Sequence, residues 1–398
     1  MLTLAEAQKL ILQNVTPTTS ESIPLLNGLN RVVSQPVRAN LAVPHFDQSG
    51  MDGFAVRSLD LAGSRQAGPV QLTISAEISA GQIDIPVLGK NEAVRIMTGA
   101  HLPVCGDQIV PFEQCHERNH TVFVNQVSRP GSHIKKAGCD LRKNRIILKK
   151  GEKISPSHLH LLASGGVEEI QVHQKPTVAI ICTGSELVKD SPAPGQTIGS
   201  NRILLNSLVH RAGGLSQDMD TVVDRASAIG EAVSGALDND IQMIITTGGM
   251  GPGKFDLVSQ CLRDAGVKFL YQRLNIRPGT STAFGMKDNI LFFALPGPPP
   301  AVQTLFCELV RPALLKLQGN HSPGPHPLRV QLKQEIVSKK KGFLSLKSAM
   351  LTLKSGNLSV QSVSRGEAAN SVIQIPPHRR RLNKGEMVTV HPFYGIMG

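Results

Sequence analysis

The chain has 398 residues and a formal net charge of +12, and 40% of its residues are hydrophobic, with 37 glycines, 26 prolines and no tryptophan. This composition is typical of a loop-rich globular protein with several domains, and it excludes an intrinsically disordered chain. No apolar run approaches the ~20 residues that a membrane-spanning helix needs, so we expect no membrane segment.

The first predicted element is a helix over residues 3–14, where apolar residues recur at helical spacing and Thr3 is a suitable N-cap. This N-terminus lacks the basic region and cleavage site of a signal peptide, and the six cysteines show no paired spacing. Both features predict a cytoplasmic protein with reduced thiols. Short β-like runs fill residues 20–150, and a second short helix is predicted over 155–166, capped by Ser155.

The pattern changes after Pro176. Apolar strands alternate there with helical segments at 201–213, 225–237, 256–266 and 299–317. Strands and helices in this order indicate a mostly parallel sheet that is covered on both faces, and ligands of such sheets gather at the carboxyl ends of the strands. Three loops rich in glycine or acidic residues follow predicted strands: CTGSEL (182–187), TTGGMGPGKFD (246–256) and ALPGPPPA (294–301).

The C-terminal region is basic and rich in predicted strands. A Pro/Gly-rich linker at 321–327 leads into residues 328–396, where apolar and polar residues alternate as in a small β domain. Residues 321–398 contain twelve Lys or Arg and three acidic residues. This balance indicates either an anionic partner or a charged surface that keeps the protein soluble. Aromatic residues make up only 4% of the chain, which disfavours single-stranded nucleic acid as the partner.

The loop TTGGMGPGKFD contains four glycines directly after a predicted buried strand. A nucleotide P-loop is disfavoured because Phe255 occupies the position of the required Ser or Thr, and Pro252 removes one backbone amide. Two interpretations remain: a tight turn without a ligand, or an anion site formed by free amides at the start of the next helix. Asp256, at that start, is expected either to cap the helix or to ligate a divalent cation.

The loops resemble those of a known family. The patterns T-x-G-G-x-x-x-G-x-x-D, T-G-x-E-L and L-P-G-x-P are marks of the molybdopterin-binding fold. The stretches SGMDGFAV (49–56), RIMTGAHLP (95–103), AGCDLRKN (137–144) and GSNRILL (199–205) resemble the molybdenum insertases, namely the bacterial MoeA proteins and the C-terminal domain of gephyrin. The resemblance runs in order along nearly the whole chain and is weakest after residue 328.

This resemblance implies a multi-domain α/β architecture. A molybdopterin-binding α/β domain with a mostly parallel sheet is expected to follow β-rich N-terminal domains and to precede a small C-terminal β-barrel-like domain. The expected bounds are 1–45 plus 140–175 for a linker and dimerisation domain, 46–139 for an inserted β-rich domain, 176–318 for the molybdopterin-binding domain and 328–396 for the C-terminal domain.

The resemblance also implies an activity. Enzymes of the family bind adenylylated molybdopterin and molybdate, insert the metal into the dithiolene and release AMP, assisted by magnesium. Carboxylates suit this chemistry because they bind hard cations, which offset the charge on a phosphate that is being cleaved. By position, the catalytic acids are expected to be Asp52, Asp140, Glu186 and Asp256, with Glu186 and Asp256 holding Mg²⁺. The residues expected to bind the pterin nucleotide are Thr98, Thr183, Gly184, Asp224, Gly248, Gly249, Gly253, Pro296, Gly297 and Pro299.

The family forms homodimers whose clefts are shared between subunits. Asp52 and Asp140 are therefore expected to act across a subunit interface. The resemblance further suggests a MogA-like adenylyltransferase or a molybdoenzyme as a protein partner, and it suggests neither nucleic acid nor membrane.

The residues expected to bind molybdate depart from the family pattern. Family members show lysines in a K-x-x-x-K-P-G-K-P stretch, where this chain has Arg273, Arg277 and the neutral Thr280. Arginine is not a neutral replacement for lysine, because its planar guanidinium binds oxyanions with a different geometry. Arg273, Arg277 and Lys347 are the cations expected to hold molybdate. The departures leave open a second function, a paralogue that binds molybdopterin or the finished cofactor without turnover and passes it to a partner.

Overall fold

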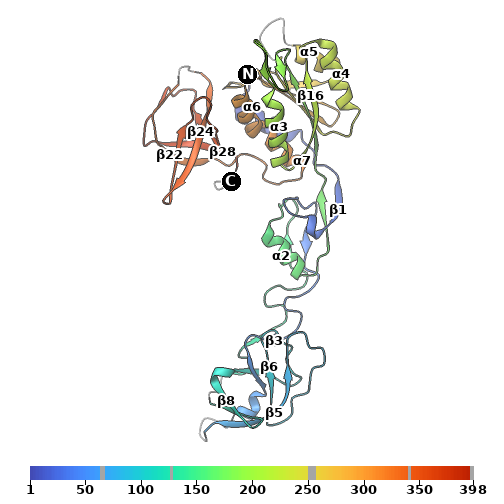
Figure 1. Ribbon diagram of the computed structural model, residues 1–398, viewed down its shortest axis with the longest axis vertical. Coiled ribbons are helices and arrows are strands. Elements are labelled where there is room, and N and C mark those ends of the chain that lie inside the picture. The colour runs from blue at the N-terminus through green and yellow to red at the C-terminus, as the bar shows by residue number, and fades with distance from the viewer. Residues whose placement is uncertain (63–67, 126–128, 250–256, 339–341, 395–398) are drawn as a thin grey trace.

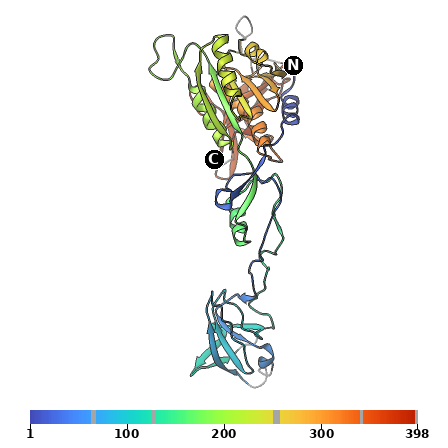
Figure 2. The same cartoon turned by 90° about the vertical axis from the view of Figure 1, so that its right-hand side faces the viewer.

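The computed structural model describes residues 1–62, 68–125, 129–249, 257–338 and 342–394. The molecule is elongated: an α/β domain and a C-terminal barrel lie at one end, and a β-rich domain lies at the other (Figure 1). A slender segment connects the two ends, and Figure 2 shows the same separation from the side. None of the described helices is long and apolar enough to cross a membrane.

The α/β domain is built on a six-stranded sheet with the strand order β16-β13-β17-β21-β20-β18. The first four of these strands run parallel, whereas β20 pairs antiparallel with both β21 and β18. The predicted mostly parallel sheet is therefore confirmed. The strands span Thr177–Thr183 (β13), Leu215–Val222 (β16), Met243–Thr247 (β17), Lys268–Tyr271 (β18), Ala283–Lys287 (β20) and Ile290–Leu295 (β21), and a small pair is formed by Leu187–Val188 (β14) and Thr197–Ile198 (β15).

Alternate residues of the central strands face two helical layers. Val178 and Ile180 pack with helices α1, α3, α6 and α7, whereas Ala179 and Ile181 pack with α4 and α5 on the opposite face. Burial on both faces explains why these strands have continuous apolar sequences. The helices span Leu4–Gln13 (α1), Ser200–Arg211 (α3), Ala226–Leu237 (α4), Leu257–Asp264 (α5), Pro299–Leu305 (α6) and Arg311–Leu317 (α7), with a π-helical turn, Phe306–Val310 (η4), between the last two.

The slender segment consists of short antiparallel pairs and one helix. β1 pairs with β12, and β2 pairs with β11. As predicted, Ser155 caps the helix α2 by accepting the backbone N–H of His158, and Thr3 caps α1 in the same way. The elements span Ser20–Pro24 (β1), Leu25–Asn27 (η1), Val37–Arg38 (β2), Ile146–Leu148 (β11), Pro156–Ser164 (α2) and Glu169–His173 (β12).

The distal domain, which is inserted between β2 and β11, contains a six-stranded sheet with the order β7-β4-β6-β5-β9-β8. A short pair, β3 with β10, lies where the domain joins the slender segment (Figure 1). The elements span Gln48–Ser49 (β3), Gly53–Val56 (β4), Ser58–Leu61 (η2), Val70–Ile78 (β5), Glu92–Ile96 (β6), Gln108–Pro111 (β7), Phe112–Gln114 (η3), Cys115–Arg118 (β8), Thr121–Val124 (β9) and Ile134–Lys135 (β10).

The C-terminal domain is a closed barrel of five strands, which confirms the expected barrel-like fold. The sheet closes because β24 pairs with both β25 and β26. The short strand β19 (Ile276–Arg277) of the α/β domain adds to β24, so the two domains share a sheet edge. The barrel strands span Leu328–Leu332 (β22), Leu344–Lys354 (β24), Asn357–Ser362 (β25), Ser371–Ile375 (β26) and Met387–Pro392 (β28), and a separate pair is formed by Ile336–Val337 (β23) and Arg381–Leu382 (β27).

Candidate functional site

The carboxyl ends of three neighbouring parallel strands bring together loops that are far apart in sequence. Cys182 of β13 lies opposite Thr247 of β17, and Thr247 lies opposite Leu295 of β21. Thr183, the last residue of β13, and Gly248 and Pro296, which directly follow β17 and β21, therefore lie at the same edge of the sheet. This edge contains most of the residues predicted to bind a pterin nucleotide.

The backbone at this edge requires glycine. Gly248 has a φ of 94°, and a Cβ there would lie 2.3 Å from the carbonyl oxygen of Thr183. Gly249 has a φ of 59°, and its Cβ would lie 2.7 Å from Cγ2 of Val258. A side chain at either position would force neighbouring atoms to move. The backbone N–H of Gly248 donates to the carbonyl oxygen of Leu295 at 3.3 Å, which ties this turn to the end of β21.

Two acidic residues flank the glycines. A Cβ on Gly184 would lie 2.9 Å from Oε1 of Glu186, so the Glu186 carboxylate lies against the strand end. The backbone N–H of Asp224 donates to Oγ of Ser185 at 3.2 Å, which ties the end of β16 to the same loop. Both acidic side chains are exposed, and neither forms an ion pair with a described residue. Asp224 is not the cap of α4, because Arg225 occupies the N-cap position.

Asn201, at the start of α3, connects the glycine edge to the next loop. Its Nδ2 donates to the carbonyl oxygen of Gly297 at 2.7 Å. Its Oδ1 is buried and has no hydrogen-bond partner among the described residues. An unpaired buried acceptor is costly, so this oxygen is a suitable acceptor for an N–H group of a ligand. The sequence places Asn201 in a family-like stretch but gives it no role.

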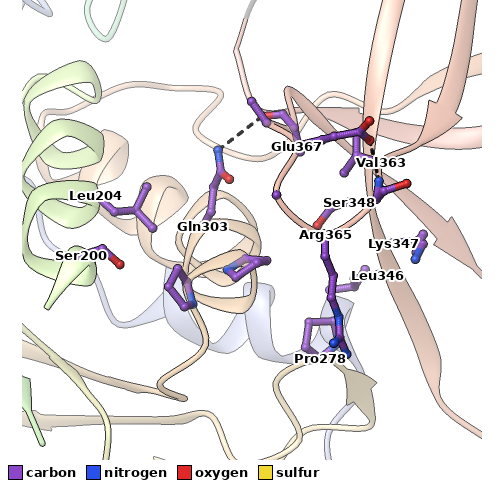
Figure 3. A pocket seen from close by; sticks show the side chains of 16 residues that line it. Ser200, Leu204, Pro278, Gln303, Leu346, Lys347, Ser348, Val363, Arg365 and Glu367 are labelled. Carbon is purple, nitrogen blue, oxygen red and sulfur yellow. Dashed lines mark hydrogen bonds between the residues drawn. The ribbon is translucent and has the colours of Figure 1, made fainter. Parts of the chain in front are cut away.

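A cavity of about 540 Å³ lies between the α/β domain and the barrel. Ser200 of α3 and Pro299 of α6 line one side, and Lys347 of β24 lines the other. Figure 3 shows the helices and the barrel strands on the two sides of this space. Ser200 adjoins Asn201 and Pro299 closely follows Gly297, so the cavity lies near the glycine edge.

Arg365 is a cavity residue that the sequence does not single out. It lies in the loop between β25 and β26, and its side chain extends toward Pro278 (Figure 3). The carboxylate of the neighbouring Glu367 accepts the backbone N–H of Ser364 at 2.7 Å instead of pairing with Arg365. Arg365 and Lys347 form no ion pair with any described residue. The cavity therefore contains two cations that are available to an anionic ligand.

The other two predicted oxyanion cations do not line this cavity. Arg277 precedes the cavity residue Pro278, but its guanidinium lies 4.7 Å from the ring centroid of Phe343, and its Nε is buried without a partner among the described residues. Arg273 is exposed and is not a cavity residue. The hydroxyl of Thr280 donates to the carbonyl oxygen of Ile276 at 2.8 Å, so it is engaged by the backbone.

The remaining predicted acids lie elsewhere in the chain. Oδ1 of Asp52 accepts both the backbone N–H and the hydroxyl of Thr98, each at 2.7 Å, and these bonds lower the pKa of Asp52. Asp140 pairs with Lys135 at 2.6 Å, which lowers the pKa of Asp140. Asp52 belongs to the distal domain, which lies at the opposite end of the molecule from the α/β domain (Figures 1 and 2). One chain therefore does not bring Asp52 to Glu186.

Removing the hydroxyl of Thr98 tests directly whether its hydrogen bond lowers the pKa of the Asp52 carboxyl group. Thr98→Val keeps the backbone bond to Asp52 but removes the side-chain bond, so the pKa of Asp52 is expected to rise toward its usual value. A depressed pKa stabilises the folded state above the unfolded pKa, and this stability is lost as pH falls through the folded pKa. As pH falls, the variant is thus expected to lose the stabilisation that ionised Asp52 contributes at a higher pH than the wild type does. NMR titration of the Asp52 carboxyl measures the shift, with Thr73→Val as control; equal pKa values in wild type and variant would contradict the assignment.

Two predicted residues cannot be placed. Gly253 and Asp256, in the loop between β17 and α5, lie outside the described residues. Among the residues that are described, no group of three His, Cys, Asp or Glu side chains is arranged to hold a metal ion. The predicted Mg²⁺ ligand pair, Glu186 and Asp256, therefore stays a prediction.

The fold and the candidate site together indicate a class of ligand. A glycine-lined edge at the carboxyl ends of parallel strands is a common place for a phosphorylated ligand to bind. Residues 2–166 match the family model described as "MoeA N-terminal region (domain I and II)", and residues 179–316 match that of the "Probable molybdopterin binding domain".

Similar proteins extend these matches over most of the chain. A Nostoc sp. protein named molybdopterin molybdenumtransferase is 33% identical, covering 79% of this chain and 73% of its own length. A Staphylococcus epidermidis protein of the same name is 31% identical, covering 84% and 80%. A crystal structure titled as the molybdopterin biosynthesis MoeA protein of Pyrococcus horikosii has a TM-score of 0.87 at 27% identity, covering 99% of this chain and 100% of that one. The chain belongs to the MoeA family.

Proposed function

We propose that this protein is a molybdopterin molybdenumtransferase, which inserts molybdate into adenylylated molybdopterin and releases AMP. The observation that carries the proposal is the proximity of the glycine edge to the cavity that Lys347 and Arg365 line. The hydrogen bond from Asn201 to Gly297 joins the two parts, since Ser200 and Pro299 line the cavity directly beside it. A pterin nucleotide on the edge and an oxyanion in the cavity would thus be neighbours.

The glycine edge would hold the nucleotide part of the substrate. Gly248 and Gly249 let the turn pack directly against Thr183 and Val258, and a phosphate would bind to backbone N–H groups of the loop that follows β17. Glu186 and Asp256 would hold Mg²⁺, and the fit is supported by the free, exposed carboxylate of Glu186 beside Gly184. A bound Mg²⁺ would offset negative charge on the phosphate that is cleaved.

The cavity would hold molybdate. Lys347 and Arg365 extend from the barrel without acidic partners among the described residues, and the planar guanidinium of Arg365 suits bidentate binding of an oxyanion. Thr280 is neutral and its hydroxyl is engaged by the backbone. Arg365 would therefore supply, from the barrel, the positive charge that position 280 lacks.

The distal acids would act in a second copy of the chain. Asp52 and Asp140 are separated from Glu186 within one chain, so a site that contains all of them requires two subunits. In a homodimer with two-fold symmetry, each subunit would offer its distal domain to the glycine edge of the other. We place this dimer in the cytoplasm, with a MogA-like adenylyltransferase or a molybdoenzyme as a protein that supplies the substrate or receives the product.

A direct assay tests the activity. With adenylylated molybdopterin, molybdate and Mg²⁺, the wild type is expected to release AMP, and Glu186→Gln is expected to release it about 100-fold more slowly, a typical cost of removing one electrostatic group from an active site. Glu231→Gln makes the same chemical change on the exposed face of α4 and is expected to leave AMP release unchanged. Equal rates of AMP release by Glu186→Gln and the wild type would show that Glu186 is not part of the active site.

A second candidate function follows from the neutral Thr280. A chain with weakened molybdate capture would bind molybdopterin or the finished cofactor and deliver it without turnover. The same assay separates the two functions, because a carrier would bind the pterin at equilibrium and release no AMP, whereas robust turnover would exclude the carrier.

A further inference from the structure

A second enclosed cavity lies at the joint between the slender segment and the α/β domain. Its volume is about 290 Å³. Arg31 and Lys153 line it from the slender segment, Lys175 from the connection into β13, and Arg211 from the last turn of α3. The ends of α3 and α7 and the start of β1 meet at this joint (Figure 1).

The side chains that line this joint cavity are strongly unbalanced in charge. Arg31, Lys153, Lys175, His210 and Arg211 line it, and none of the described residues that line it is acidic. Arg31 pairs with Glu21, outside the lining, and the Arg211 guanidinium lies over the ring of Tyr394 at 3.5 Å.

Lys153 and Lys175 are both exposed, and their side chains form no ion pair or hydrogen bond with any described residue. Lys153 belongs to the slender segment, and Lys175 to the connection between β12 and β13.

Like charges around one cavity repel one another, although water and salt screen this repulsion at exposed lysines. A bound anion would remove this repulsion and satisfy both lysines. We propose that the joint cavity binds a small multiply charged anion of the phosphate class, either inorganic phosphate or a small phosphorylated metabolite. The volume lies at the lower end of the range for ligand pockets, so a compact anion fits better than a large nucleotide.

Such an anion would connect two parts of the molecule. The joint is otherwise held by a few hydrogen bonds, including Thr18 N–H to the carbonyl oxygen of Leu317 at 2.8 Å and His321 N–H to that of Gly151 at 3.3 Å. An anion that binds Lys153 and Lys175 together would stiffen the joint. Because the slender segment carries the distal domain, the anion concentration would then control how firmly that domain is held relative to the α/β domain.

Titration calorimetry with inorganic phosphate tests the proposal on the full-length chain. The Lys347→Gln, Arg365→Gln background removes both unpaired cations from the cavity beside the barrel, so the signal from the joint is measured separately. Adding Lys153→Gln and Lys175→Gln is expected to weaken phosphate binding roughly tenfold or more, because each charged hydrogen bond contributes substantially to affinity. The matched control, Lys354→Gln with Lys384→Gln, removes the same charge from the barrel surface outside both cavities and is expected to bind phosphate like the background.

Hydrogen exchange supplies an independent readout. Phosphate is expected to slow amide exchange at residues 18–34 and 315–321 in the background chain, and to leave it unchanged after the two joint substitutions. Equal phosphate affinity with and without Lys153 and Lys175 would overturn the proposal, as would an equal loss in the barrel control. If a small phosphorylated metabolite displaces phosphate and binds more tightly through the same two lysines, the anion is the metabolite and not inorganic phosphate. AMP release by the wild type is independent of these outcomes, so failure here leaves the proposed activity standing.

Discussion

Gly248→Ala is expected to destabilise the protein by about 3 kcal/mol and to abolish binding of the pterin nucleotide. Two causes act together: a φ of 94° is unfavourable for any residue with a Cβ, and that Cβ would lie 2.3 Å from the carbonyl oxygen of Thr183. The strand ends would have to separate to relieve the contact. Since β13 and β17 are central strands, the separation would disturb the whole edge. Denaturant unfolding measures the loss of stability, and equilibrium binding of the nucleotide measures the loss of function.

Gly230→Ala is the matched control for this substitution. A Cβ at Gly230 would meet no atom within 4 Å, and the residue lies within α4. Alanine favours a helix over glycine by about 0.5–1 kcal/mol, so this variant is expected to be slightly more stable than the wild type. If Gly248→Ala unfolds at the same denaturant concentration as the wild type and still binds the nucleotide, the close approach at the glycine edge has no role.

The second large effect is expected at the cavity beside the barrel. Removing both cations with Lys347→Gln and Arg365→Gln is expected to raise the KM for molybdate by about 100-fold, since a hydrogen bond to a charged group contributes about 1.5–3 kcal/mol. The affinity for the pterin nucleotide is expected to change little, because the glycine edge remains intact. The measurement is AMP release at varied molybdate, with nucleotide affinity determined separately.

Single substitutions separate the two cations. Arg365→Lys keeps the charge but loses the planar fork, so it is expected to fall between the wild type and Arg365→Gln. Lys354→Gln, at the far end of β24, is expected to leave the molybdate dependence unchanged. A normal KM for molybdate in Arg365→Gln would show that the missing charge at Thr280 is not replaced from the barrel.

The parallel part of the α/β sheet could be predicted from sequence because its strands are buried on both faces. Val178 to Cys182 are all fully buried, and a doubly buried strand is a continuous apolar run in sequence. β20 was not predicted, because Gly285 interrupts its apolar residues. That glycine is required by a contact made only in the folded sheet, where a Cβ would lie 2.9 Å from the carbonyl oxygen of Lys268 in β18.

The site was predictable only where backbone geometry dictates the residue type. The glycines after β17 are visible in sequence, since a turn with positive φ and no room for a side chain leaves few alternatives. Arg365 gives no such signal in the sequence, because its place in the cavity depends on how a barrel loop packs against residues near Pro278. The family resemblance predicted that Asp52 acts across a subunit interface, but the length of the slender segment that separates Asp52 from Glu186 could not be predicted, since motif order carries no information about it.

The central claim is that one functional site contains Glu186 of one chain and Asp52 of another. Mixing the inactive variants Asp52→Asn and Glu186→Gln tests it most directly. If sites form between chains, half of the randomly assembled dimers contain one site with both acids intact, so AMP release is expected to recover to about one quarter of the wild-type rate. Each variant alone, and Glu186→Gln mixed with Glu186→Ala, is expected to stay inactive. A mixture of Asp52→Asn and Glu186→Gln that remains inactive, although the chains are shown to exchange, would contradict the claim.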